Sequence, residues 1–168
     1  GRLTLGKKKY AAVQDQVEKI VGTADELRSR LEAAVTQDAR AFEAVLAANR
    51  LPADSEQAMQ ARRAAMEKAS LHAGEVPLAV VRDCGEILAL ALEIAPIGNL
   101  TAISDAGVAG DLAQAGLSGA ALNVKVNAAG LQDPEPRERW LTELETVQAS
   151  AQAALGKLRG VLTERAGL

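Results

Sequence analysis

Aromatic residues are almost missing from this chain of 168 residues, which contains one Phe, one Tyr and one Trp. Nucleic-acid-binding proteins stack bases on aromatic rings and place clusters of basic residues against phosphates. The formal net charge here is -3, and three aromatic residues are too few for such stacking. The composition therefore argues against a nucleic-acid partner.

Cysteine and histidine each occur once. A single cysteine, Cys84, excludes an internal disulfide and fits a reducing compartment, so we expect a cytoplasmic protein. A single histidine, His72, excludes a histidine-rich metal site, and the sole cysteine gives no zinc pattern. His72 fits a surface residue near a helix end better than a catalyst. Cys84 has apolar neighbours and fits a small hydrophobic side chain better than a nucleophile.

Long apolar runs are also absent. The longest, from Ile87 to Ala95, is interrupted by Glu93 and is too short to span a bilayer. The first residues do not have the pattern of a signal peptide. We therefore expect no membrane partner.

The residues that are abundant favour helices. Ala, Leu, Glu, Gln and Arg dominate, and the period-two alternation of strands is nearly absent. We expect an all-α protein, a single domain over residues 1–168 built as an antiparallel bundle of long and short helices. Apolar spacing and Gly or Pro breaks predict helices at 10–21, 23–49, 55–73, 76–95, 105–117, 118–129 and from about 134 to 162.

One stretch, from Pro96 to Gly130, is crowded with Gly and Ala and has only three charged residues. A helix with so few charges is expected to be enclosed by other helices or by a second subunit. The glycines lower helix propensity, and close approach of a helix or ligand would account for them. Its few polar groups include Asn99, Asp105, Asn123 and Asn127, with Ser104 placed to cap a helix.

Asp38 lies in an otherwise apolar stripe that includes Val35 and Phe42. A buried carboxylate needs a partner or a raised pKa. We weigh a structural hydrogen-bonding role and an acid–base role equally. For Asp105 we likewise weigh two roles equally, a charge that the first turn of a helix stabilises and a role in a functional site.

Three lysines, Lys7, Lys8 and Lys9, form a short basic run near the start. Such a run most often faces water at the end of a helix. A role in binding an anionic ligand is the alternative.

Four blocks of sequence follow one another along most of the chain. They are LTLGKKKY (3–10), DARAFEAVLAANRLP (38–52), VPLAVVRDCGEILAL (76–90) and GNLTAISDAGVAGDLAQAGLSGAALNVKVN (98–127). As a set they resemble the cyclodeaminase/cyclohydrolase family. That family comprises the cyclodeaminase domain of formiminotransferase-cyclodeaminase and the free-standing bacterial methenyltetrahydrofolate cyclohydrolases.

The resemblance implies a helical bundle that forms a homodimer with folate sites near the subunit interface. The expected reaction is hydrolysis of methenyltetrahydrofolate to the formyl form, and the alternative is cyclisation of formimidoyltetrahydrofolate with release of ammonia. A tetrahydrofolate derivative is the substrate, and neither reaction requires a metal or redox cofactor. Carboxylates suit both, because each needs a general base and a group that stabilises a cationic carbon.

The resemblance also assigns roles to residues. Asp38 and Asp105 are the expected acid–base or cation-stabilising groups. The residues expected to bind substrate are Lys7, Lys8 and Lys9 at the glutamate tail, and Asn99, Asn123 and Asn127 at the pterin or a water molecule.

One departure from the family pattern leaves an alternative open. The Pro-Thr-Pro-Gly-Gly-Gly-Ser type of motif that precedes the LTLGKKKY block is absent from this sequence. We expect that the domain is present without its N-terminal helix. The alternative from another class is a non-catalytic helical module that binds a protein partner.

Overall fold

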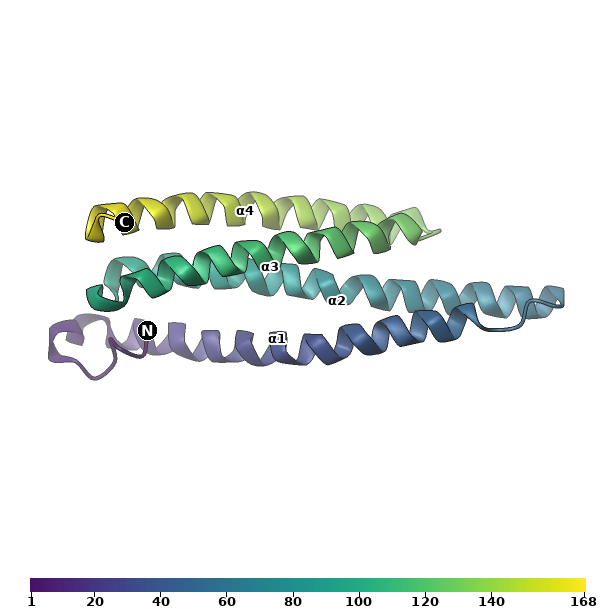
Figure 1. Cartoon of the computed structure of the whole chain (residues 1–168), viewed down its shortest axis with the longest axis horizontal. Coiled ribbons are helices and arrows are strands. Elements are labelled where there is room, and N and C mark those ends of the chain that lie inside the picture. Colours follow the sequence, from purple (N-terminus) through teal and green to yellow (C-terminus); the bar gives the residue numbers. More distant parts are fainter.

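The computed structural model describes residues 1–168 and contains four long helices that lie lengthwise beside one another (Figure 1). The helices are α1 (Gln14–Asn49), α2 (Glu56–Ile97), α3 (Ile103–Gly130) and α4 (Pro134–Ala166), with short 3-10 helices η1 (Lys8–Val13) and η2 (Leu100–Ala102). The all-α prediction is confirmed. The C-terminal end of α1 and the N-terminal end of α2 extend beyond α3 and α4 as a projecting hairpin (Figure 1).

Three predicted breaks are wrong, because the helices run through them. α1 continues through Gly22, α2 through Gly74 and Pro77, and α3 through Leu117 and Ser118. Local breaker signals are weak when tertiary contacts compensate for their cost. The predicted cap of α3 is wrong as well, since the helix begins at Ile103, one residue before Ser104.

Side-chain caps begin two of the helices. Ser55 precedes α2 and its hydroxyl accepts a hydrogen bond from the amide of Ala58 at 3.2 Å. Asp133 precedes α4 and its carboxylate accepts one from the amide of Glu135 at 3.0 Å. Each cap satisfies an amide that has no partner within its own helix.

Contacts with other helices compensate for the two residues, Gly74 and Pro77, that would otherwise interrupt α2. Gly74 lies directly under the ring of Trp140, where a Cβ atom would come within 2.1 Å of two ring carbons. Pro77 has no amide hydrogen, so the carbonyl of Ala73 loses its usual helical donor. The side-chain amide of Asn127 on α3 donates to that carbonyl at 3.2 Å. Packing and one side-chain hydrogen bond thus keep α2 continuous.

The main core is formed by three helices. Its cluster of 21 buried residues comes from α2, α3, α4 and Leu131, and includes no residue of α1. Leu88, Leu117, Trp140 and Leu158 are fully buried in it. α1 packs against α2, and its contacts with α3 and α4 are few. One side of α1 and one side of α3 are therefore left without a neighbour.

A charged pair helps to fix α1 on α2. The guanidinium of Arg30 donates two hydrogen bonds to Asp83, at 3.0 and 2.8 Å, and one to Glu86 at 3.1 Å. Asp83 is only 8% exposed, so its carboxylate depends on Arg30 for a partner.

None of the helices is both long and apolar enough to cross a membrane.

Candidate functional site

A groove runs along the molecule where α1 and α3 pack on α2 with few contacts to each other. Two cavities open along it. We call the first the end cavity, of about 370 Å³, and the second the middle cavity, of about 280 Å³. Their nearest lining residues are seven positions apart on each helix, Ala24 and Leu31 on α1 for example. The cavities are thus about 10 Å apart along the helices.

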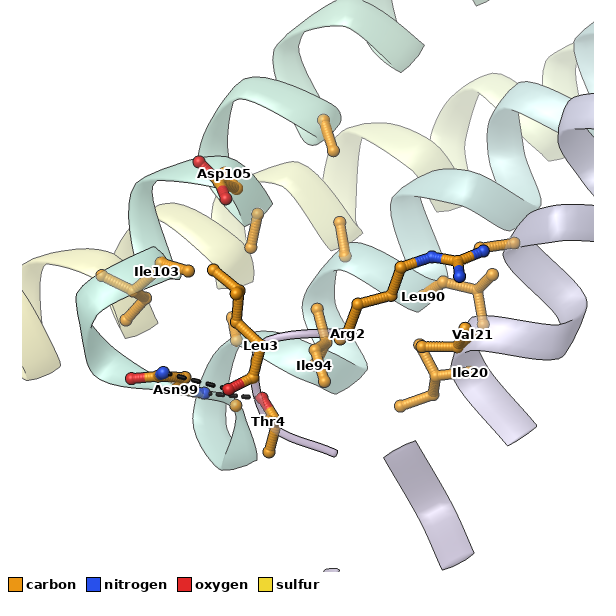
Figure 2. Close-up of a pocket in the computed structure, with 18 of the residues that line it drawn as sticks. Arg2, Leu3, Thr4, Ile20, Val21, Leu90, Ile94, Asn99, Ile103 and Asp105 are labelled. Atoms are coloured by element: carbon orange, nitrogen blue, oxygen red, sulfur yellow. Dashed lines mark hydrogen bonds between the residues drawn. The ribbon is translucent and has the colours of Figure 1, made fainter. Parts of the chain in front are cut away.

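The end cavity is mostly apolar and is closed on one side by the N-terminal segment, residues 1–4 (Figure 2). Its other walls come from the start of α1, the end of α2 and the start of α3. Asp105 and Asn99 contribute polar groups to its lining. Asp105 lies in the first turn of α3, where the helix dipole favours its anionic form. Its carboxylate is exposed and forms no hydrogen bond or ion pair.

Asn99 holds the N-terminal segment against the turn between α2 and α3. Its backbone amide donates to the Thr4 hydroxyl at 2.9 Å, and its side-chain amide donates to the Leu3 carbonyl at 3.1 Å (Figure 2). Its side-chain oxygen accepts bonds from the amide and hydroxyl of Thr101 and from the hydroxyl of Tyr10. Asn99 thus has a structural role here, and its contact with a ligand stays a prediction.

The segment that carries the three lysines is a loop braced by Gln14. The Gln14 side chain accepts from the amide of Gly6 at 2.8 Å and donates to the carbonyls of Thr4 and Tyr10, at 3.2 and 2.8 Å. Gly6 has a φ of 72°, a conformation that favours glycine. Sequence reasoning did not find Gln14, because nothing in its local pattern indicates that it bonds to the loop before it.

The lysines themselves point to water. Lys7, Lys8 and Lys9 are exposed and none forms an ion pair. The ammonium of Lys9 lies 5.6 Å from the ring centroid of Tyr10, in cation–π range. Because Tyr10 also bonds to Asn99, the loop stays beside the end cavity. Three unpaired cations thus lie near a mostly apolar cavity.

The middle cavity contains the other predicted carboxylate. Asp38 of α1 and Asn123 of α3 line it, together with Gly116 and the Val76–Pro77 segment of α2. The expectation that Asp38 is buried is wrong, because its side chain is exposed. Other helices cover α1 on one side only. The stripe that includes Asp38 therefore lies beside the buried residues of α1 rather than among them. Asp38 has no hydrogen-bond or ion-pair partner.

Asn123 and Asn127 lie on one side of α3, as their spacing predicts. The exposed side chain of Asn123 forms no hydrogen bond, whereas Asn127 donates to the carbonyls of Ala73 and Asn123. Asn127 therefore uses both of its donors inside the protein. Asn123 is the asparagine whose side chain is free to contact a ligand.

The small residues of α3 divide into two groups. A Cβ on Gly107 or Gly110 would meet Leu162 or Leu158 of α4 within 3 Å, so these glycines allow close helix packing. Gly116 faces the buried Cys84, and burial raises the pKa of that thiol above its ordinary value, with the Asp83 carboxylate adding to the effect. Gly119 faces open space. The expectation of an enclosed helix thus holds for one side of α3.

The structure therefore separates the predicted site residues. Asn99 and Asp105 lie at the end cavity with the lysine loop nearby, and Asp38 and Asn123 lie at the middle cavity. His72 is exposed and Cys84 is buried, as the sequence predicts, and neither lines either cavity. No group of three or more His, Cys, Asp or Glu side chains comes together as a metal site would require.

Comparison with known proteins gives consistent matches. The family model described as formiminotransferase-cyclodeaminase matches residues 1–146. Methenyltetrahydrofolate cyclohydrolase of Methylorubrum extorquens is 44% identical over 151 residues, which cover 90% of this chain and 73% of that protein. Formimidoyltransferase-cyclodeaminase of Sus scrofa is 29% identical over 94% of this chain, which spans 30% of that protein.

A solved structure has the same architecture. The crystal structure of formiminotetrahydrofolate cyclodeaminase from Thermotoga maritima superposes with a TM-score of 0.86 at 28% identity, covering 97% of this chain and 77% of that one. The match extends over nearly all of the four helices described above. From the family model, the sequence relatives and this fold, we conclude that the chain belongs to the formiminotransferase-cyclodeaminase family.

Proposed function

We propose that this chain is a methenyltetrahydrofolate cyclohydrolase, a single helical domain that hydrolyses the methenyl group to the formyl form. The observation that carries the proposal is the 44% identity with the Methylorubrum extorquens cyclohydrolase over 90% of this chain. Two cavities with unpaired carboxylates support it, because the reaction needs a base near a cationic carbon.

The chemistry requires little beyond well-placed polar groups. A water oxygen adds to the methenyl carbon and gives its proton to a base, which leaves a tetrahedral carbon between two nitrogens. One carbon–nitrogen bond then breaks, the nitrogen is protonated and the hydroxyl proton is lost as the formyl group forms. Asp38 and Asp105 are the proposed base and cation-stabilising groups, with Asn123 orienting water or the pterin. Asn99 and Asn127 support the site indirectly, because their side chains donate hydrogen bonds to the backbone carbonyls of Leu3 and Ala73.

The lysine loop suits the other end of the substrate. The glutamate tail of a folate carries carboxylates, and ammonium groups bind carboxylates without demanding one geometry. Lys7, Lys8 and Lys9 are exposed and unpaired, and they follow the segment 1–4 that lines the end cavity. In this proposal they hold the tail while the one-carbon unit lies in the groove.

A second reaction has specific support. The solved Thermotoga maritima relative is a formiminotetrahydrofolate cyclodeaminase, and the Sus scrofa relative carries that activity in its name. In that direction a base deprotonates the attacking nitrogen and an acid protonates the departing ammonia. The 44% identity with the cyclohydrolase exceeds the 28% and 29% of these relatives, and we therefore place hydrolysis first.

We also propose that the working form is a homodimer. Large apolar side chains remain exposed on the uncovered sides of α1 and α3, among them Phe42 at 61% and Leu112 at 69%. Apolar surfaces of this kind mark contacts with another protein. Light scattering after size exclusion gives the mass directly, and a mass of one chain at micromolar concentration would refute this part.

The test presents both substrates to the purified protein. We expect faster loss of methenyltetrahydrofolate absorbance than in buffer, and slower or no ammonia release from formimidoyltetrahydrofolate. Asp38→Asn and Asp105→Asn should each lower kcat by about 100-fold or more with unchanged helical circular dichroism. Asp54→Asn, an exposed carboxylate outside the cavities, is the matched control. Full turnover in either cavity variant excludes that residue from the chemistry.

A further inference from the structure

The end of α2 leaves one carbonyl without a donor from its own helix. In a continuing helix, the backbone amide of Asn99 would donate to the carbonyl of Ala95, four residues earlier. That amide instead donates to the hydroxyl of Thr4 at 2.9 Å and forms no bond to Ala95. Ala95 is only 2% exposed, so its carbonyl has little access to water. A buried carbonyl of this kind needs a partner from elsewhere in the protein.

Arg165 supplies that partner from the last turn of α4. Its guanidinium donates to the carbonyl of Ala95 and to the carbonyl of Gly98, the latter at 3.5 Å. The Arg165 side chain is half-buried and forms no ion pair with a carboxylate. A cation at the C-terminal end of a helix also complements the partial negative charge there. Arg165 thus binds both the end of α2 and the turn that follows it.

This contact leaves the amide of Asn99 available to the N-terminal segment. If the carbonyl of Ala95 took its donor from Asn99, that amide would point back along the helix rather than towards Thr4. Thr4 is 1% exposed, and its hydroxyl accepts the hydrogen bond from this amide. The side chain of Asn99 adds a bond to the carbonyl of Leu3 (Figure 2). Arg165 therefore acts on residues 3 and 4 through Asn99.

The N-terminal segment in turn shapes the end cavity. Residues 1–4 form one wall of that cavity, and Asn99 lines it as well. The lysine loop follows this segment, and the side chain of Gln14 joins the loop to the carbonyl of Thr4 at 3.2 Å. A displaced turn at Asn99 would therefore displace both the cavity wall and the lysine loop.

We propose that Arg165 is a positioning residue for the end cavity, because it holds the turn at Asn99 in the conformation that binds the N-terminal segment. This proposal rests on the proposed function. The start of α3 is fixed independently, since Ile103 and Ala106, on either side of Asp105, are buried in the main core. Loss of Arg165 should therefore weaken substrate binding and leave the Asp105 carboxylate in place.

Steady-state kinetics on methenyltetrahydrofolate test the positioning role. Arg165→Gln removes the charged donor, so KM should rise about tenfold while kcat stays within about twofold of wild type. Arg165→Lys keeps a charged donor without the fork that reaches two carbonyls, so its KM should be intermediate. Arg159→Gln is the matched control and should keep the wild-type KM, because Arg159 joins α4 to α3 through an exposed pair with Asp111 outside the end cavity.

The split between KM and kcat distinguishes positioning from a merely structural role. A loss of stability alone would reduce the fraction of folded enzyme, which lowers the apparent kcat and leaves KM unchanged. An unchanged KM in Arg165→Gln would overturn the proposal. An equal rise of KM in Arg159→Gln would overturn it as well.

A double-mutant cycle tests the route through Asn99. Thr4→Val keeps the shape of the side chain and removes the hydroxyl that accepts from the Asn99 amide, so it should also raise KM. Because both substitutions act on the same turn, the double variant Thr4→Val/Arg165→Gln should have a KM no higher than the larger of the two single values. A KM raised by the product of the two single effects would mean that Arg165 acts elsewhere.

Hydrogen–deuterium exchange tests the same contact without substrate. In Arg165→Gln, peptides that cover residues 1–6 and 98–102 should exchange several-fold faster than in wild type, because their hydrogen bonds open more often. A peptide over residues 134–146 is the internal control, since it ends about 28 Å along α4 from Arg165. Arg159→Gln should leave exchange at residues 1–6 unchanged.

These outcomes separate the inference from the function itself. A wild-type protein without turnover refutes the proposed function, while exchange still decides whether Arg165 holds the N-terminal segment. Faster exchange with an unchanged KM refutes the positioning role and leaves the hydrolase activity standing. Exchange that is unchanged at both segments overturns the proposal whatever the kinetics.

Discussion

Replacing Gly74 with alanine should unfold the protein more easily, although alanine usually stabilises a helix. A Cβ at this position would lie 2.1 Å from two carbons of the Trp140 ring. Trp140 is fully buried, and its indole NH donates to Glu75 at 3.0 Å, so the ring cannot move aside without losing that bond. Overpacking costs about 1–3 kcal/mol, and alanine returns about 1 kcal/mol of helix propensity. We expect a net loss of up to about 2 kcal/mol.

Urea denaturation followed by far-ultraviolet circular dichroism measures this loss at a fixed protein concentration. The emission of Trp140, the only tryptophan, reports on the ring itself. Gly22→Ala is the matched control, because nothing lies within 4 Å of its added Cβ and the site is inside α1. That variant should gain up to about 1 kcal/mol. If Gly74→Ala is as stable as Gly22→Ala, the contact between α2 and α4 is not as close as described.

Three other perturbations have defined outcomes. Gln14→Leu removes three hydrogen bonds from the lysine loop, so KM for the folate substrate should rise several-fold at constant kcat, and an unchanged KM would contradict the role of the loop. Cys84 should react with iodoacetamide far more slowly in the folded protein than in urea, because burial raises its pKa, and equal rates would contradict its burial. The hydrogen bond from Arg82 lowers the pKa of Glu143 below its unfolded value, so its stabilisation is present at neutral pH and is lost as pH falls through the folded-state pKa. Glu143→Gln should therefore cost about 0.5 kcal/mol at neutral pH, and a cost that persists in acid would contradict the ion pair.

Helix content, the cap at Ser55 and the long final helix could be predicted from the sequence. They depend on local signals, namely apolar spacing, a side-chain acceptor before the first turn and the absence of strand periodicity. The burial of Cys84 could be predicted too, since its neighbours in sequence are apolar on most sides of the helix.

The continuity of the helices could not be predicted, because it depends on partners far away in sequence. Pro77 indicates a break until Asn127, fifty residues later, is seen to bond to the carbonyl that the proline leaves unpaired. The need for glycine at position 74 is likewise evident only when the ring of Trp140 is seen to pack against it. The exposure of Asp38 depends in the same way on which neighbours α1 lacks. Local patterns contain none of this information.

The missed continuity of α3 changes the interpretation of the site most. A break near Leu117 and Ser118 would let the second half of this stretch fold back and bring Asn123 towards Asp105. The observed helix is unbroken, and these two residues are eighteen positions apart on the same edge. At 1.5 Å per residue that is about 27 Å, too far for both to act on one methenyl carbon. Within one chain, therefore, only one cavity can contain the reacting carbon, and Asp38 and Asp105 can both act on that carbon only across the contact between two copies of the chain.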